Sequence, residues 1–150
     1  MSSFSVFANQ RNVTRNQSTL DIQRQDIFIY GPRYQNETFI NSGSNPFTAA
    51  TGILVARQTV APFGVIPIED SKDLANVIGI LRLEGGEIEL ASGESTQADV
   101  CISSDIDTTL LDLPTDVTLN TKVGDKCLKD VLTSLGFVLF NVTELSKFDN

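Results

Sequence analysis

The chain has 150 residues, of which 11 are basic and 19 acidic, so its formal net charge is −8 (11 − 19). It contains no histidine, which excludes catalysis and metal binding that depend on an imidazole, including the Ser-His-Asp triad. The acidic balance argues against nucleic-acid binding, because such proteins present a basic face to the phosphates. We therefore expect a binding or assembly protein that uses no cofactor.

The chain carries no pattern that predicts association with a membrane. It lacks a run of about 18 consecutive apolar residues, which is the minimum for a membrane-spanning helix. Its first 17 residues also lack the cationic start and apolar run of a signal peptide. We expect a protein that is made in the cytoplasm and has no membrane partner.

Charge and composition change near residue 48. Residues 1–48 have a net charge of +1 (4 − 3), whereas residues 49–150 have a net charge of −9 (7 − 16). The first part is also rich in Asn, Gln and Ser, and its apolar residues are thinly spread. We therefore expect residues 1–48 to form an extended N-terminal arm and residues 49–150 to form a separate β-rich domain.

Within this arm, Asp26–Tyr30 is the one segment that looks like a strand, because Ile27 and Ile29 alternate with Phe28 and Tyr30. A turn is expected after it, at Asn41–Pro46. The alternative is that this part of the chain is the first hairpin of the domain.

The body of the chain reads as mostly β. Val77–Leu83 is apolar on both faces apart from Arg82, which is typical of a central strand covered on both sides. Two later segments alternate apolar and polar residues and are separated by a Ser-Gly-Glu turn, so we expect them to pair as a hairpin. The predicted strands are Gly52–Arg57, Val65–Ile68, Val77–Leu83, Gly86–Leu90 and Ser95–Ser103.

One helix is predicted near the C-terminus. Apolar residues recur at helical spacing from Cys127 to Leu135, with Asp125 as a candidate cap and Gly136 as a left-handed stop. Phe137–Phe140 follows as a buried final strand. The expected fold is therefore mainly β with one short α-helix.

No catalytic or metal-binding motif is apparent. Asp105, Asp107 and Asp112 lie close together, but the central Gly and closing Glu of a calcium loop are missing, so no metal site is expected. Glu84 and Glu87 flank two glycines, which we interpret as hairpin chemistry rather than a pair of catalytic carboxylates.

Several short segments resemble the head decoration (cement) proteins of tailed bacteriophages, the family typified by the small decoration protein of phage lambda. They are Gly52–Ala56 (GILVA), Ile78–Leu81 (IGIL), Thr96–Val100 (TQADV), Ser103–Asp105 (SSD) and Leu132–Gly136 (LTSLG). The resemblance covers roughly residues 49–143. It implies a small β-barrel or β-tulip-like domain, usually a homotrimer. Such proteins bind the major capsid protein on the outer surface of the expanded virion capsid and stabilise it against the internal DNA pressure.

We expect capsid binding to reside in the N-terminal arm. Four of the six arginines lie there, and Asp26–Tyr30 has the pattern of a strand that could add to a sheet edge of the capsid protein. The candidate capsid-binding residues are Arg11, Arg15, Arg24, Ile27, Phe28, Ile29, Tyr30 and Arg33.

Two alternatives remain open at this point. The first is a small trimeric β ligand-binding domain or enzyme, with pockets between subunits lined by Arg82, Asp99 and Asp105. The second is a component of a head-fibre or tail-fibre base.

Overall fold

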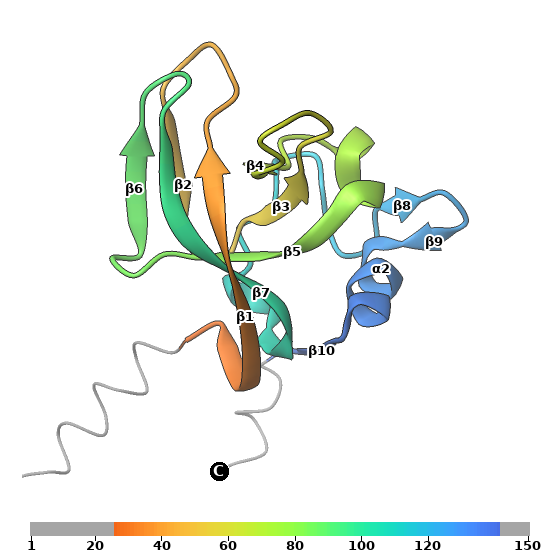
Figure 1. Ribbon diagram of the computed structural model, residues 1–150. Helices are drawn as coiled ribbons and strands as arrows, with labels where there is room; N and C mark the ends of the chain where they lie inside the picture. Colours follow the sequence, from red (N-terminus) through yellow and green to blue (C-terminus); the bar gives the residue numbers. More distant parts are fainter. Residues whose placement is uncertain (1–25, 142–150) are drawn as a thin grey trace, which may run out of the picture.

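The computed structural model describes residues 26–141, which form a mainly β domain with one short α-helix (Figure 1). This confirms the fold class expected from the sequence. The strands are β1 (Phe28–Ile40), β2 (Phe47–Ala50), β3 (Leu54–Arg57), β4 (Val65–Pro67), β5 (Val77–Arg82), β6 (Glu87–Leu90), β7 (Ser95–Asp107), β8 (Lys122–Val123), β9 (Lys126–Cys127) and β10 (Phe137–Phe140). The helices are the 3-10 helices η1 (Ser71–Asn76) and η2 (Thr108–Leu110) and the α-helix α2 (Leu128–Leu135).

The main sheet closes on itself. Its strand order is β1-β4-β3-β5-β7-β10, and β1 also pairs with β7. Strands β1, β4, β3, β5 and β7 therefore form a ring, and β10 extends the sheet beyond it. Two short ladders, β2-β6 and β8-β9, lie on opposite sides of the ring (Figure 1).

Strand β7 is long enough to pair with three other strands. It runs antiparallel to β1 from Ile40↔Ser95 to Phe28↔Ile106. On its other side it pairs first with β5, at Ile80↔Cys101, and then in parallel with β10, at Phe137↔Ser104. One continuous strand thus links the ring to the C-terminal part of the chain.

The strand pairing of the ring is weakest between β1 and β4, which share the single register pair Phe39↔Val65. The backbones approach so closely here that a Cβ atom at Gly64 would lie 2.6 Å from the carbonyl oxygen of Thr38. Glycine is therefore required at position 64 for the two strands to meet.

The central strands bury both of their faces, as predicted for Val77–Leu83. Ile80 and Leu81 are both fully buried, yet they belong to two different hydrophobic clusters. Successive side chains of a strand point to opposite faces, so the clusters cover the two faces of the sheet. One cluster draws on all five ring strands and on β2 and β6, and the other lies against α2 and η1.

Helix α2 closes the second cluster. Leu128 and Leu132 are fully buried, and Gly136 ends the helix with a left-handed φ of 119°, as predicted. The predicted cap at Asp125 is wrong. Strand β9 leads directly into the helix, so Cys127 takes the N-cap position and Asp125 lies in the preceding turn.

The predicted hairpin of Gly86–Leu90 with Ser95–Ser103 is also wrong. Strand β6 pairs with β2, while β7 pairs with β1 and β5. The buried Asn41 lies where the hairpin would have formed. Its side chain donates to the carbonyl of Leu90, and its backbone exchanges hydrogen bonds with Gly93 and Glu94.

The structure places the start of the domain earlier than residue 48. Strand β1 belongs to the ring, so residues 28–40 are not part of an arm, and residues 1–25 lie outside the described residues. The first-hairpin alternative also fails, because β1 pairs with the distant β7 and not with β2. The composition change was misleading because most residues of β1 are exposed although the strand itself is paired.

Replacing Leu132 by Ala is expected to lower the free energy of unfolding by about 2–5 kcal/mol, because it leaves a cavity beneath α2. Lys129→Ala, at an exposed position of the same helix, is the matched control and should cost under about 0.5 kcal/mol. Denaturant unfolding curves of the two variants provide the measurement. Equal losses would show that α2 does not pack as described.

Candidate functional site

The predicted capsid-binding residues do not form one surface. Arg11, Arg15 and Arg24 lie outside the described residues. Ile27 and Phe28 are 4% and 5% exposed and belong to the core, so they are not available to a partner and their assignment as contact residues is corrected. The exposed members of the set are Ile29, Tyr30 and Arg33.

The regular alternation expected over Asp26–Tyr30 breaks down because β1 is irregular at this end. The ladder with β7 shifts register between Phe28 and Tyr30 and again between Tyr30 and Arg33. Gly31 has a left-handed φ of 64° within this stretch. Ile27 and Phe28 are both buried before this stretch, whereas the consecutive residues Ile29 and Tyr30 within it are 45% and 75% exposed.

Tyr30 begins a row of side chains across three strands. It pairs with Asp105 of β7, which pairs with Val138 of β10. Directly paired residues project from the same face of a sheet, so these three side chains form one surface, here called the Tyr30 surface. Val138 is 51% exposed, and β10 is the last strand of its sheet. Exposed side chains beside an open strand edge are typical of a protein-binding surface.

Of the residues proposed for a pocket between subunits, Arg82 and Asp99 lie together. A guanidinium nitrogen of Arg82 is 3.6 Å from a carboxylate oxygen of Asp99, and its central carbon lies 5.2 Å from the ring centroid of Tyr34. Burial raises the pKa of Tyr34. Asp105 belongs to the Tyr30 surface instead.

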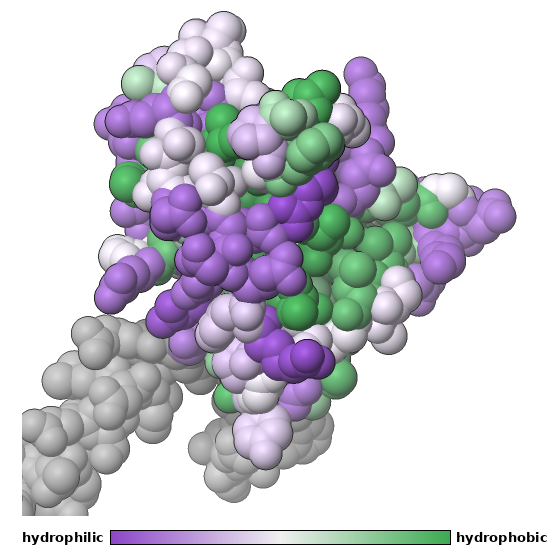
Figure 2. All heavy atoms as spheres, in the orientation of Figure 1, coloured by the Kyte–Doolittle hydropathy of each residue, from purple (hydrophilic) through white to green (hydrophobic). Residues whose placement is uncertain are grey.

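The loop between β3 and β4 presents apolar side chains to solvent. Val60 and Phe63 are 63% and 54% exposed, and Figure 2 shows hydrophobic residues at the tip of this loop. Phe63 has φ 63°, a left-handed conformation that is costly for a bulky residue.

Hydrogen bonds hold this loop to the ring. Arg57 donates to both carboxylate oxygens of Glu37 on β1, at 2.6 and 2.7 Å, and to the carbonyl of Phe63 at 2.7 Å. The amide of Gln58 donates to the carbonyl of Gly64 at 2.9 Å, and the amide of Gly64 donates to the side chain of Gln58. The exposed apolar side chains are therefore presented by a preorganised loop.

The hydrogen bonds from Arg57 hold the pKa of Glu37 below its ordinary value of 4.5. A second hydrogen bond, from the side chain of Gln35, lowers the pKa further, and burial opposes both. The ion pair reaches from β3 across to β1, beside the single β1–β4 register pair. It therefore stabilises the ring where strand pairing is weakest.

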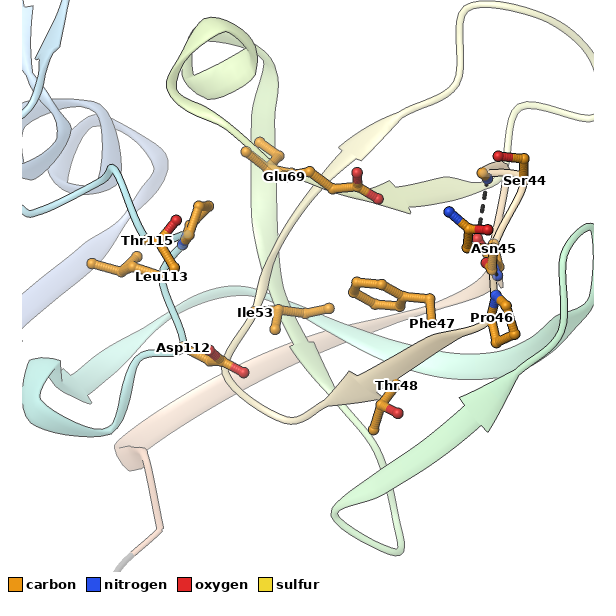
Figure 3. A pocket seen from close by; sticks show the side chains of 14 residues that line it. Ser44, Asn45, Pro46, Phe47, Thr48, Ile53, Glu69, Asp112, Leu113 and Thr115 are labelled. Carbon is orange, nitrogen blue, oxygen red and sulfur yellow. Dashed lines mark hydrogen bonds between the residues drawn. The ribbon is translucent and has the colours of Figure 1, made fainter.

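A groove of about 600 Å³ lies between the turn after β1, the start of β3 and residues 112–115; we call it the acidic groove. Figure 3 shows Phe47 and Ile53 pointing toward each other in its middle, with Glu69 on one edge and Asp112 on the other. The wall at residues 41–46 is held by Asn41, whose side-chain amide donates to the carbonyl of Asn45 at 2.8 Å. No sequence pattern indicated this groove, because its lining comes from separate parts of the chain.

Residues 26–141 contain no group of three His, Cys, Asp or Glu side chains placed to hold a metal ion. No helix in the same range is long and apolar enough to cross a membrane.

The comparisons with known proteins returned no relatives. No family model matches the chain, and neither a curated protein nor a solved structure matches it.

The Glu37–Arg57 pair predicts a specific acid sensitivity. A carboxyl whose pKa is lowered on folding adds stability above its unfolded pKa and loses it as the pH falls through the folded pKa. Glu37→Gln should therefore be less stable than the wild type at neutral pH, and this difference should shrink as the pH falls below about 4.5. Urea unfolding at several pH values provides the measurement. A difference that stays constant down to pH 2 would contradict this role of the pair.

Proposed function

We propose that the protein is a structural capsid decoration protein, which binds the outer surface of an expanded phage capsid and stabilises it against the internal DNA pressure. The observation that carries this proposal is where the segments resembling that family lie in the fold. Gly52–Ala56, Ile78–Leu81 and Thr96–Val100 fall on β3, β5 and β7, which are neighbours in the sheet, and Leu132–Gly136 ends the helix packed against them. The resemblance thus concerns one continuous core rather than scattered matches.

The exposed features of the domain support a binding function of this kind. The Tyr30 surface presents hydrophobic side chains from the closed sheet. So does the loop between β3 and β4 with Val60 and Phe63, here called the apolar loop. Rigid contact surfaces lose little conformational entropy on binding. The major capsid protein is the proposed partner, and the Tyr30 surface is the proposed contact with it, because Tyr30 and Val138 are exposed beside the edge strand β10.

The capsid contact is tested by co-sedimentation with expanded capsids of the phage that encodes the chain, followed by electron microscopy. The double variant Tyr30→Ser/Val138→Ser should lower occupancy at least tenfold, because a loss of about 1.4 kcal/mol corresponds to that factor. Ile88→Ser, at an exposed hydrophobic residue of β6 outside the Tyr30 surface, is the matched control and should bind normally.

Melting curves accompany this test and should show that both variants remain folded. Equal occupancy of the two variants would overturn the assignment of the Tyr30 surface. Absence of wild-type protein from the capsids would overturn the proposed function itself.

We further propose that the protein is a homotrimer, or becomes one on the capsid. Figure 2 shows a hydrophobic area over the region where β5 runs toward α2, and a contiguous exposed apolar area of this kind favours self-association. Two hydrophobic residues of α2, Val131 and Leu135, are only partly buried against the cluster that this helix covers. Native mass spectrometry should detect monomers and trimers. A stable dimer or tetramer would contradict the trimeric arrangement.

A further inference from the structure

Strand β2 borders the acidic groove with an unpaired edge. Within residues 26–141 it pairs with β6 alone, and Phe47 and Thr48 of β2 are among the residues that line the groove. An unpaired strand edge carries backbone N–H and C=O groups that another extended chain can bind. The groove therefore offers main-chain hydrogen bonds as well as a cavity.

The register of the β2–β6 ladder shows which backbone groups of β2 are free. Thr48 lies opposite Glu89. Three residues further on, the amide of Thr51 donates to the carbonyl of Gly86 at 2.9 Å. Hydrogen-bonded and non-hydrogen-bonded positions alternate along an antiparallel pair, so the N–H and C=O of Thr48 point away from β6. Neither group has a backbone partner elsewhere in the described part of the chain.

Apolar side chains form the floor of the groove beside this edge. Ile53 and Ile68 are buried there, and Phe47 and Leu113 are partly buried around them. Phe47 and Ile53 face each other across the middle of the floor (Figure 3). Alternate side chains of a strand project to the same side, so an added strand turns every second side chain toward this floor. The floor therefore favours apolar residues at alternate positions of the occupant.

Glu69 and Asp112 give the rim of the groove a negative charge. Both are exposed, and neither forms an ion pair within residues 26–141. The backbone of Asp112 is held in place, because its amide donates to the carbonyl of Gly52 at 3.1 Å and it forms a β-bridge with Ile53. No lysine or arginine of the described residues lines the groove. A lysine or arginine of the occupant can therefore pair with either carboxylate.

We propose that the acidic groove binds an extended peptide segment of a partner protein, which adds as a strand to the free edge of β2. The segment carries apolar residues at alternate positions over Phe47 and Ile53, and a lysine or arginine beside Glu69 or Asp112. β2 has four residues, so at about 3.3 Å per residue the pairing extends over about 13 Å. This interaction goes beyond the proposed function, because it is a second binding site with its own chemistry and does not involve the Tyr30 surface.

The first experiment measures peptide binding to the full-length protein by fluorescence anisotropy. The probe is a labelled peptide with blocked ends and the sequence Thr-Leu-Thr-Leu-Thr-Arg, and the control peptide has glutamate in place of the arginine. The arginine peptide should bind about fivefold more tightly, the scale expected for an exposed ion pair. Equal affinities of the two peptides would overturn the proposal.

A pair of charge variants locates this preference on the protein. Asp112→Lys should remove the preference for the arginine peptide, because it places a positive charge on the rim. Asp125→Lys makes the same charge change in the exposed turn between β8 and β9 and should keep the preference. Melting curves should show that both variants remain folded. The same preference in both variants would overturn the assignment to the groove.

The second experiment tests strand addition by NMR measurement of amide exchange in the full-length protein. Saturating arginine peptide should slow exchange at Thr48 about tenfold or more, because its N–H gains a hydrogen-bond partner. The amide of Glu89 is the matched control. It lies opposite Thr48 and points away from β2, so its exchange should not change. Unchanged exchange at Thr48, or equal slowing at both amides, would overturn strand addition to β2.

The same measurement without peptide tests the identity of the occupant. Slow exchange at Thr48 in the protein alone would overturn the assignment to a partner protein. Protection that is independent of protein concentration would identify another segment of the same chain as the occupant. Protection that increases with concentration would identify a second copy.

Discussion

The antiparallel pairing of β1 with β7 is the interaction on which the whole domain depends. β7 hydrogen-bonds to β1 along one side and to β5 and then β10 along the other. Without it, the strand pairing of β1 with the ring would be reduced to the single Phe39↔Val65 pair with β4. The helix α2 depends on the same strand indirectly, because β10, which follows it, is held in place by β7.

Apart from Tyr30, which pairs with Asp105 of β7, the features with a proposed role in binding lie outside the β1–β7 ladder. Tyr30 and Val138 belong to strands that flank β7, the apolar loop joins β3 to β4, and the acidic groove is built from connecting segments. Two hydrophobic clusters fill both faces of the central strands. Substitutions at these surfaces therefore do not expose the core. The apolar loop is the exception, because the same guanidinium of Arg57 donates to the carbonyl of Phe63 in the loop and to Glu37 on β1.

The strands were predictable where the pattern of apolar residues reflects burial, but their partners were not. Val77–Leu83 and the helix ending at Gly136 were found because burial on both faces and helical spacing are local signals. The pairing of β6 depends on Asn41, which is 49 positions before Leu90, and no local pattern encodes that contact. In the candidate site, the alternation over Asp26–Tyr30 predicts opposite faces for Ile27 and Phe28, yet both are buried. The register shifts of β1 against β7 after Phe28 depend on the distant partner strand and are not encoded in that local pattern. The groove could not be predicted from the sequence because its lining residues come from separate segments and are close only in the folded chain.

The length of the β1–β7 connection has a consequence for how the protein folds. Paired residues of the two strands are between 55 (95 − 40) and 78 (106 − 28) positions apart in the chain. Closing so long a loop costs entropy before any of the pairing is gained, and domains dominated by such contacts fold on the scale of milliseconds to seconds. During synthesis on the ribosome, β1 precedes the other strands of the ring and has only the single Phe39↔Val65 pair with β4 until β7 has followed it. Ring closure is therefore a late event, because β1 and β7 can pair along their length only after strands β2 to β6 have been made.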